Sequence, residues 1–161
     1  MHRTYLLLGS NIGDRIRWLA FARREIASRI GTLHRISSVY QSAAWGLTDQ
    51  ASFLNQALAV DTSLDPERLL KETALIEDIA GRQRSVHWGA RTLDIDVLFY
   101  DALTVQTKRL TIPHPEFQNR NFAMLTLLEI APDLVHPVSG LRIRDLVNLS
   151  LDQSEVSILP D

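Results

Sequence analysis

The stretch of sequence that decides the fold is RTLDIDVLFY, residues 91–100. Its polar side chains, Asp94 and Asp96, alternate with the apolar side chains of Leu93, Ile95, Val97 and Phe99. Successive side chains of a β-strand point to opposite faces of a sheet, so this alternation predicts a strand over Thr92–Tyr100. With strict alternation, Leu98 and Tyr100 continue the face that carries the two carboxylates.

Further elements are predicted on both sides of this strand. Before it lie a strand at 5–8 closed by a turn at 9–11, a helix with Leu19, Ala22, Ile26 and Ile30 on its buried face and Gly31 as its stop, and strands at 36–41 and 54–62. Asp65 and Pro66 start a second helix, which buries Leu69, Thr73, Ile76 and Ala80 and ends at Gly81. After residue 100 come a short strand near 109–111 and a helix marked by Phe122, Leu125 and Leu128, which stops before Pro132.

The order of these elements, βαββαβ with a helical appendage, predicts an α+β fold. We expect a ferredoxin-like core, in which helices cover an antiparallel sheet. A length of 161 residues fits one domain over 1–161.

Composition restricts the class of protein. The chain has no cysteine, no apolar run of membrane-spanning length and no signal-peptide pattern at its start, so we expect a cytoplasmic protein without a membrane partner. Its net charge of -2 gives no general attraction to nucleic acid. Positive charge is nevertheless concentrated between residues 82 and 120.

Asp94 and Asp96 are the candidate metal ligands. Two carboxylates at this spacing lie about 6 to 7 Å apart along the backbone, so both can reach one cation or two adjacent ones. Oxygen ligands favour magnesium, which completes its shell with water and substrate phosphates. A solvated face of an antiparallel sheet explains the same pattern.

Arginines surround this strand, and guanidinium groups bind phosphate bidentately. They are Arg82, Arg84, Arg91, Arg109 and Arg120. Together with the carboxylates they indicate a polyphosphate substrate, although each arginine alone is more simply a solvated surface residue. Residues 9–14, GSNIGD, lack the Gly-Lys-Ser/Thr ending of a P-loop, so a structural turn is the better interpretation there.

Aromatic and amide side chains near residue 50 suggest a pocket for a flat heterocycle. Trp45, Gly46 and Phe53 could form its walls, and the amide of Asn55 could read the ring edge. Phe53 is also consistent with a core position. The five histidines show no spacing typical of a transition-metal site, but His114, between Pro113 and Pro115, could contact phosphate.

These segments together resemble the 6-hydroxymethyl-7,8-dihydropterin pyrophosphokinases of folate biosynthesis. The matching pieces are GSN at 9–11, WG at 45–46, DQASFLN at 49–55, GRQR at 81–84, WGARTLDIDVLFY at 88–100, RLTIPHP at 109–115, NRNF at 119–122 and EIAPDLVHP at 129–137. The resemblance covers nearly the whole chain and implies transfer of pyrophosphate from ATP to the pterin hydroxymethyl group, with release of AMP.

The resemblance also implies residue roles. Asp94 and Asp96 would hold two magnesium ions and, with Arg82 and Arg91, would be catalytic. The ATP contacts would be Glu77, Arg84, Trp88, Arg109, Thr111, His114 and Arg120. The pterin contacts would be Phe53, Asn55 and Phe122, with Ser42, Ala43, Trp45 and Gly46 completing the pocket. Arg82, Arg84, Trp88 and Arg91 would belong to a catalytic loop that closes over the nucleotide.

Some positions depart from the family pattern, namely Ala43, Ala44, Phe53, Ala74 and Pro115. They affect the expected shape of the pterin loop and the adenine contacts, but they remove no metal ligand. Two rival functions are a nucleic-acid-binding ferredoxin-like module and a magnesium-dependent phosphohydrolase. The first lacks an aromatic pair on its central strands, and the second lacks an evident water-activating base. A monomer suffices for the expected site.

Overall fold

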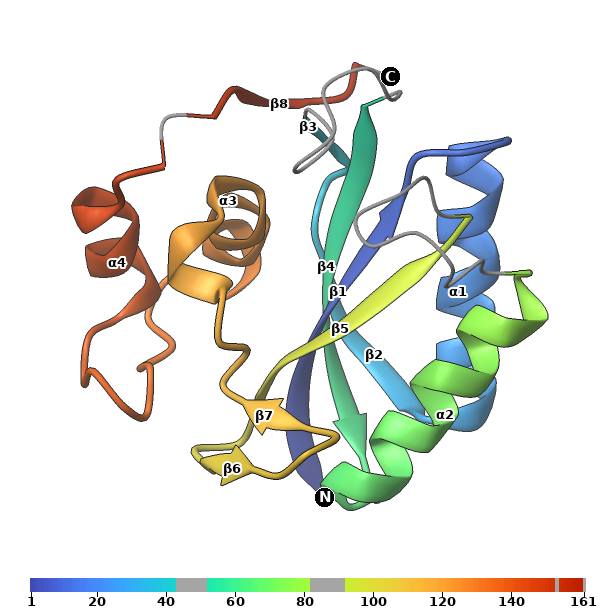
Figure 1. Cartoon of the computed structure of the whole chain (residues 1–161), viewed down its shortest axis with the longest axis horizontal. Coiled ribbons are helices and arrows are strands. Elements are labelled where there is room, and N and C mark those ends of the chain that lie inside the picture. The colour runs from blue at the N-terminus through green and yellow to red at the C-terminus, as the bar shows by residue number, and fades with distance from the viewer. Residues whose placement is uncertain (43–51, 82–91, 153, 161) are drawn as a thin grey trace.

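An antiparallel sheet lies at the centre of the computed structural model, which describes residues 1–42, 52–81, 92–152 and 154–160. Within these ranges six strands form the sheet in the order β5-β1-β4-β3-β8, and β2 also pairs with β4 (Figure 1). Their bounds are β1 His2–Ser10, β2 Gly31–Ile36, β3 Tyr40–Ser42, β4 Phe53–Thr62, β5 Asp94–Tyr100 and β8 Val156–Ile158. The expected antiparallel α+β arrangement is therefore confirmed.

Helices cover both faces of the sheet (Figure 1). One face packs against α1 (Arg15–Arg29) and α2 (Pro66–Ile79), and the other packs against α3 (Asn121–Ile130) and α4 (Ile143–Leu149). We call the two apolar layers the α1/α2 core and the α3 core. None of the described helices is long and apolar enough to span a membrane.

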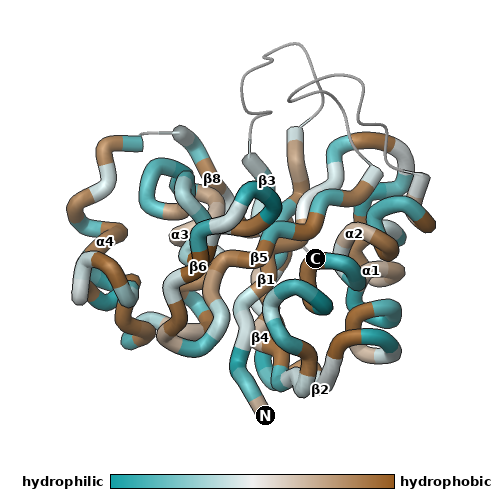
Figure 2. The backbone as a smooth tube through the Cα atoms, turned by 60° about the horizontal axis from the view of Figure 1, so that its bottom comes forward, coloured by the Kyte–Doolittle hydropathy of each residue, from teal (hydrophilic) through white to brown (hydrophobic). Residues whose placement is uncertain are grey.

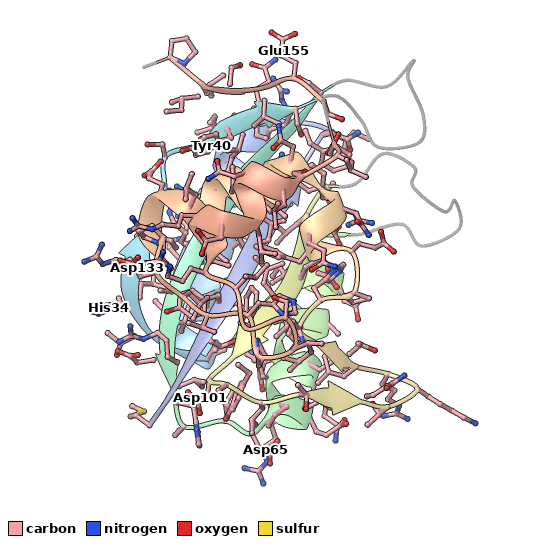
Figure 3. All side chains as sticks on the ribbon, turned by 90° about the vertical axis from the view of Figure 1, so that its left-hand side faces the viewer. His34, Tyr40, Asp65, Asp101, Asp133 and Glu155 are labelled. Atoms are coloured by element: carbon pink, nitrogen blue, oxygen red, sulfur yellow. The ribbon has the colours of Figure 1, made fainter. Side chains whose placement is uncertain are left out.

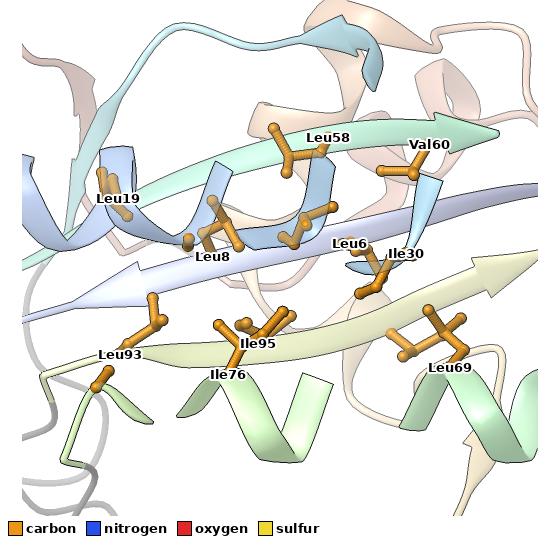
Figure 4. Close-up of a cluster of buried hydrophobic side chains, with 14 of the residues drawn as sticks. Leu6, Leu8, Leu19, Ile30, Leu58, Val60, Leu69, Ile76, Leu93 and Ile95 are labelled. Atoms are coloured by element: carbon orange, nitrogen blue, oxygen red, sulfur yellow. The ribbon is translucent and has the colours of Figure 1, made fainter. Parts of the chain in front are cut away.

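Strand β1 shows how the sequence divides between these two cores. Leu6 and Leu8 pack in the α1/α2 core, whereas Tyr5 and Leu7 pack in the α3 core. Both faces of the strand are buried, so its sequence is a continuous apolar run. Figure 2 shows hydrophobic stretches along the central strands, and Figure 4 shows Leu6 and Leu8 between side chains of β4, β5 and the two helices.

The predicted starts of the first two helices have local causes in the structure. The carboxylate of Asp65 accepts a hydrogen bond from the N–H of Arg68 at 2.8 Å, and Pro66 occupies the first helical position. Asp14 accepts from the N–H of Arg17 at 3.2 Å at the start of α1. Gly81 follows α2 with a positive φ of 77°, as expected for a helix stop.

Gly31 has a different role from the predicted one. Helix α1 ends at Arg29, and Gly31 is already the first residue of β2. A Cβ atom on Gly31 would lie 1.9 Å from the backbone oxygen of Asp61 on the paired strand β4. Close approach of two backbones therefore requires this glycine, and termination of the helix does not.

Two strand predictions near the N-terminus were wrong. The strand expected at 36–41 is divided between β2 and β3, because residues 37–39 leave the ladder and the N–H of Ser37 donates to the carbonyl of Ala57. The turn expected at 9–11 begins later, because Gly9 and Ser10 extend β1. Gly9 is paired with Asn55 on one side and with Asp94 on the other.

The alternation predicted for residues 91–100 holds through Leu98, which packs on the same face as Asp94 and Asp96, and is wrong for Phe99 and Tyr100. Leu98 is an extra residue opposite the Tyr5–Leu6 step of β1, so β5 contains a β-bulge there. As a result, Leu98 and Phe99 both pack in the α3 core, while Tyr100 packs in the α1/α2 core.

Strand β5 is followed by a hairpin of β6 (Val105–Gln106) and β7 (Thr111–Ile112), a 3₁₀ turn η1 (Phe117–Asn119) and α3. The helix expected before Pro132 is confirmed, but its fully buried apolar side chains are those of Ala123, Met124, Leu127 and Ile130. Phe122, Leu125 and Leu128 are only half-buried. Strands β6 and β8 were not predicted, and only the last residue of β2, Ile36, fell within a predicted strand.

Candidate active site

Asp94 and Asp96 lie at the start of β5, on the face of the sheet that α3 covers. Asp96 is paired with Leu7, whose side chain packs in the α3 core, and paired residues direct their side chains to the same face. Both aspartates are half-buried, and the side chain of Asp96 is 27% exposed. They are thus accessible to a ligand at the start of the strand.

Glu77 secures the strand between these two aspartates. It is a buried residue of α2, and its Oε2 accepts a hydrogen bond from the backbone N–H of Ile95 at 2.8 Å. Ile95 lies on β5, which ends the order of the sheet in the described part of the chain. The carboxylate therefore satisfies an edge amide that has no partner on a further strand.

The bulge in β5 brings His114 to the carboxylates. The backbone N–H of His114 donates to the carbonyl of the bulge residue, Leu98, at 3.0 Å. The Nε2 atom of the ring lies 4.0 Å from Oδ2 of Asp96. A cis peptide bond joins Ile112 to Pro113 immediately before this residue. The irregularity that sequence alternation missed thus positions a site residue.

The imidazole of His114 has defined hydrogen-bonding roles. Its Nδ1 accepts from the N–H of Glu116 at 3.1 Å, which leaves the proton of the neutral ring on Nε2. Burial and the charge of Arg120 lower the pKa of His114, and the charges of Asp94 and Glu116 oppose them only in part. The ring is therefore a neutral donor at neutral pH.

Asn55, Gly9 and Asp94 form a row across β4, β1 and β5. Asn55 and Asp94 are the register partners of Gly9 on either side. A Cβ atom on Gly9 would lie 3.3 Å from Oδ1 of Asn55, 3.5 Å from Cδ1 of Phe53 and 3.9 Å from Cβ of Asp94. Gly9, which has no side chain, therefore lies on β1 between the expected pterin residues of β4 and the first carboxylate of β5.

The amide of Asn55 is fixed from the other side by Ser42. Its Nδ2 donates to Oγ of Ser42 at 2.8 Å, and both side chains are buried. Because Nδ2 is the donor here, the orientation of the amide is set, and Oδ1 points toward Gly9. Phe53 is half-buried beside this group.

The start of α3 brings an aromatic ring and an arginine to the same face. The guanidinium carbon of Arg120 lies 5.9 Å from the ring centroid of the half-buried Phe122. The positive charge of Arg120 also lowers the pKa of His114. Arg120 thus connects an expected pterin contact with expected ATP contacts.

The β6–β7 hairpin carries the remaining described candidates. Thr111 is half-buried on β7, and it lines a cavity of about 350 Å³ together with His114. Arg109 is exposed just before β7, and its backbone N–H donates to Oγ1 of Thr107 at 3.3 Å. Arg109 is therefore the described candidate least fixed by its surroundings.

Several predicted site residues lie outside the described part of the chain. They are Ala43, Trp45 and Gly46 before β4, and Arg82, Arg84, Trp88 and Arg91 before β5. Gly9 was predicted in a turn, so its place on β1 between Asn55 and Asp94 was not foreseen. A glycine next to an apolar run also signals a close backbone approach, which was the available clue.

Comparison with known proteins gives a consistent result. The model of the family "7,8-dihydro-6-hydroxymethylpterin-pyrophosphokinase (HPPK)" matches residues 5–132. A 2-amino-4-hydroxy-6-hydroxymethyldihydropteridine pyrophosphokinase of Methylorubrum extorquens is 43% identical over 157 residues, which cover 97% of this chain and 98% of the relative. A protein of the same name from Aquifex aeolicus is 41% identical over 138 residues, 86% of each chain.

Solved structures show the same fold. The HPPK-DHPS of Plasmodium falciparum superimposes with a TM-score of 0.74 at 18% sequence identity. The match covers 92% of this chain and 43% of that chain, so this chain spans less than half of the solved protein. At this identity the likeness establishes the fold alone.

Proposed function

Because the chain belongs to the 7,8-dihydro-6-hydroxymethylpterin-pyrophosphokinase family, we propose that Asp94 and Asp96 hold the magnesium with which it transfers pyrophosphate from ATP. The acceptor is the hydroxymethyl group of 6-hydroxymethyl-7,8-dihydropterin, and the reaction is a step of folate biosynthesis. The family assignment decides against a nucleic-acid-binding module and a phosphohydrolase.

The row Asn55–Gly9–Asp94 is the observation that carries the site assignment. It places an amide suited to a heterocycle and a carboxylate suited to a metal on the two register partners of Gly9, which has no side chain of its own. A pterin bound at Asn55 would extend its hydroxymethyl group over Gly9 toward Asp94. The short distance suits a reaction in which that hydroxyl must meet a phosphate.

The donor set fits magnesium. Two carboxylates on one strand face are the usual protein contribution to a magnesium site, since phosphates and water supply the other ligands. Among the described residues no group of three His, Asp or Glu side chains could hold a metal without substrate. We propose that Asp94 and Asp96 would hold two ions, which when bound would neutralise charge on the ATP phosphates.

The pterin would bind between the rings of Phe53 and Phe122. Asn55 would hydrogen-bond the amide edge of the pterin through Oδ1, while one N–H of its Nδ2 donates to Ser42 and holds the amide in place. Ala43, Trp45 and Gly46 would complete the pocket. Aromatic faces on a flat ring supply affinity, and the fixed amide supplies orientation.

ATP would lie on the side of Asp94 and Asp96 that faces away from the pterin. Arg120 and the Nε2–H of His114 would donate to phosphate oxygens, and Thr111 and Arg109 would contact the nucleotide from the hairpin. Arg82, Arg84, Trp88 and Arg91 would contribute from the preceding segment, with Arg82 and Arg91 catalytic. Glu77 would act through β5, because its Oε2 is committed to Ile95.

The reaction follows from this placement. The pterin hydroxyl oxygen attacks the β-phosphorus of ATP in line with the bond to the α-phosphate. A new P–O bond forms at the pterin while the α–β bridging bond breaks, and its electron pair leaves with AMP. The hydroxyl proton passes to a phosphate oxygen or to water. No covalent enzyme intermediate is required, so the protein acts by positioning and charge neutralisation.

One copy of the chain carries every proposed ligand, so we propose that a monomer acts as a single catalytic domain. The lack of cysteine is compatible with a cytoplasmic location. Incubation of the protein with magnesium, ATP and the reduced hydroxymethylpterin tests the function. Formation of AMP and pterin pyrophosphate only when all three are present is expected. Pterin-dependent ADP would contradict the proposal.

A further inference from the structure

Helix α3 is capped by a residue far along the chain. The residue preceding it, Arg120, makes no capping hydrogen bond with its side chain. Instead, the backbone N–H of Asn121 donates to Oδ2 of Asp152 at 2.7 Å. A carboxylate at a helix N-terminus satisfies a free amide and interacts favourably with the helix dipole. The first turn of α3 therefore depends on the chain that follows α4, which contains Asp152 and β8 and which we call the C-terminal segment.

Asp152 is itself held in place by that segment. Its Oδ1 accepts from the N–H of Ser154 at 2.9 Å, and its own N–H donates to Oγ of Ser150 at 3.2 Å. The side-chain amide of Asn121 donates in return to the carbonyl of Ser154 at 3.0 Å. Burial acts to raise the pKa of Asp152, but the hydrogen bonds from Ser154 and Asn121 bring it below the ordinary value. The cap is therefore charged at neutral pH.

The same segment continues to the other wall of the expected pterin pocket. It forms β8, which pairs with β3 and places Val156 opposite Ser42. Ser42 accepts the hydrogen bond that orients Asn55. The C-terminal segment thus contacts both the helix that begins beside Phe122 and the strand that ends at Ser42.

The far end of α3 is fixed independently. Glu129 accepts from the hydroxyl of Tyr40 at 2.7 Å and from the N–H of Ser38 at 2.8 Å. Burial and the Glu129 carboxylate raise the pKa of Tyr40 to about 12, so this bond persists at neutral pH. With one end of the helix held there, loss of the Asp152 contact would be felt mainly in the first turn, where Phe122 lies.

We propose that Asp152 is a positioning residue for the pterin, because its carboxylate sets the first turn of α3 and so the place of Phe122 relative to Asn55. This inference rests on the proposal that Phe122 and Asn55 bind the pterin. A solely structural role of Asp152 would lower stability without a selective effect on the pterin. The two roles therefore differ in a measurable way.

Asp152→Ala tests the inference, with Asp65→Ala as the matched control. Asp65 likewise accepts a hydrogen bond from a backbone N–H in the first turn of a helix, here as the local N-cap residue of α2, and Figure 3 places it at the opposite end of the molecule from Tyr40 and Glu155. Both variants should lose melting temperature, because each loses a helix cap. Asp152→Ala should raise the KM for pterin about fivefold to tenfold with kcat within about twofold of wild type, whereas Asp65→Ala should leave both unchanged.

Two further variants sharpen the test. Asp152→Asn keeps an acceptor oxygen and should restore most of the pterin affinity. Glu155→Ala removes an exposed carboxylate from the same segment and should behave as wild type. Pterin affinity is also measured directly, by calorimetry with magnesium and a non-hydrolysable ATP analogue. An unchanged pterin affinity in Asp152→Ala, or an equal loss in Asp65→Ala, would overturn the inference.

The wild-type protein separates this inference from the proposed function. If wild type forms AMP and pterin pyrophosphate but the Asp152 variants show no selective loss, the inference alone fails. If wild type neither binds pterin nor forms the product, the proposed function fails and the positioning role fails with it.

Discussion

The carboxylate of Glu77 accepts a hydrogen bond from the backbone N–H of Ile95, the residue between the two candidate metal ligands. Helix α2 thereby fixes the strand that carries Asp94 and Asp96, although Glu77 lies 18 residues away from Ile95 along the chain. A buried carboxylate beside this strand supports its geometry and need not contact the nucleotide.

Replacement of Glu77 by leucine should therefore destabilise the start of β5. An unpaired buried amide costs about 1–3 kcal/mol, so the free energy of unfolding should fall by that amount and kcat should fall as the carboxylates shift. Glu77→Gln keeps an acceptor oxygen and should lose less of both. Urea unfolding and steady-state kinetics measure these effects. Equal stability of wild type and Glu77→Leu would contradict this role.

Single replacement of Asp94 or Asp96 by asparagine should remove turnover while the domain stays folded. Each change removes a charged metal ligand from a half-buried position, and we expect kcat to fall by about a hundredfold or more. The control is Asp101→Asn, just after the same strand, where Oδ1 accepts from the N–H of Arg3 at 2.8 Å. Measurement of kcat for wild type and each variant over a range of magnesium concentrations tests this prediction. Wild-type turnover in either site variant would refute the metal assignment.

Gly9→Ala should weaken pterin binding more than it weakens the fold. The new methyl group would lie 3.3 Å from Oδ1 of Asn55, closer than ordinary packing allows, so the amide must shift. We expect the KM for pterin to rise while the KM for ATP stays near wild type. Gly140→Ala, at a positive φ of 75°, is the control for a strained backbone away from the site. A pterin KM equal in all three proteins would show that Gly9 is not part of the pocket.

His136 should contribute to loss of stability in acid. Its Nδ1 accepts from the N–H groups of Val138 at 3.2 Å and Ser139 at 3.3 Å, and burial lowers its pKa below the ordinary value. The unfolded chain therefore binds this proton first as the pH falls. The stabilisation is complete above the ordinary pKa of about 6.5 and is lost as the pH falls through the lower pKa of the folded state.

His136→Asn retains an acceptor near the Nδ1 position and cannot titrate. Its unfolding free energy should decline less than that of wild type between about pH 7 and pH 5, as urea unfolding at several pH values would show. The exposed His34, labelled in Figure 3, provides the control variant His34→Asn. An identical decline in wild type and His136→Asn would exclude His136 as a source of acid sensitivity.

The sequence predicted those parts of the fold that have local causes. Asp65 and Pro66 start α2 through a contact three residues away, and the apolar runs of β1 and β4 fill the two cores. The bulge at Leu98 could not be predicted from alternation, because it depends on the partner strand β1. The break between β2 and β3 likewise depends on a hydrogen bond from Ser37 to Ala57 across the sheet.

In the candidate site, too, features with a local cause could be predicted and features that depend on another element could not. The spacing of Asp94 and Asp96 was visible in the sequence, since it depends only on the period of a strand. The contacts of Glu77, Gly9 and Asp152 were not, because each is made with a residue of another element. For Asp152 the partner, Asn121, lies 31 residues earlier, and no local pattern records that contact.

The fate of the three phosphorus atoms of ATP tests the central claim most directly. Protein, magnesium and pterin are incubated in parallel with ATP labelled at the α, β or γ position, and the products are separated. We predict equal transfer of the β and γ labels to the pterin, with the α label entirely in AMP. Transfer of the γ label alone, or of the α label to the pterin, would contradict transfer of an intact pyrophosphate group.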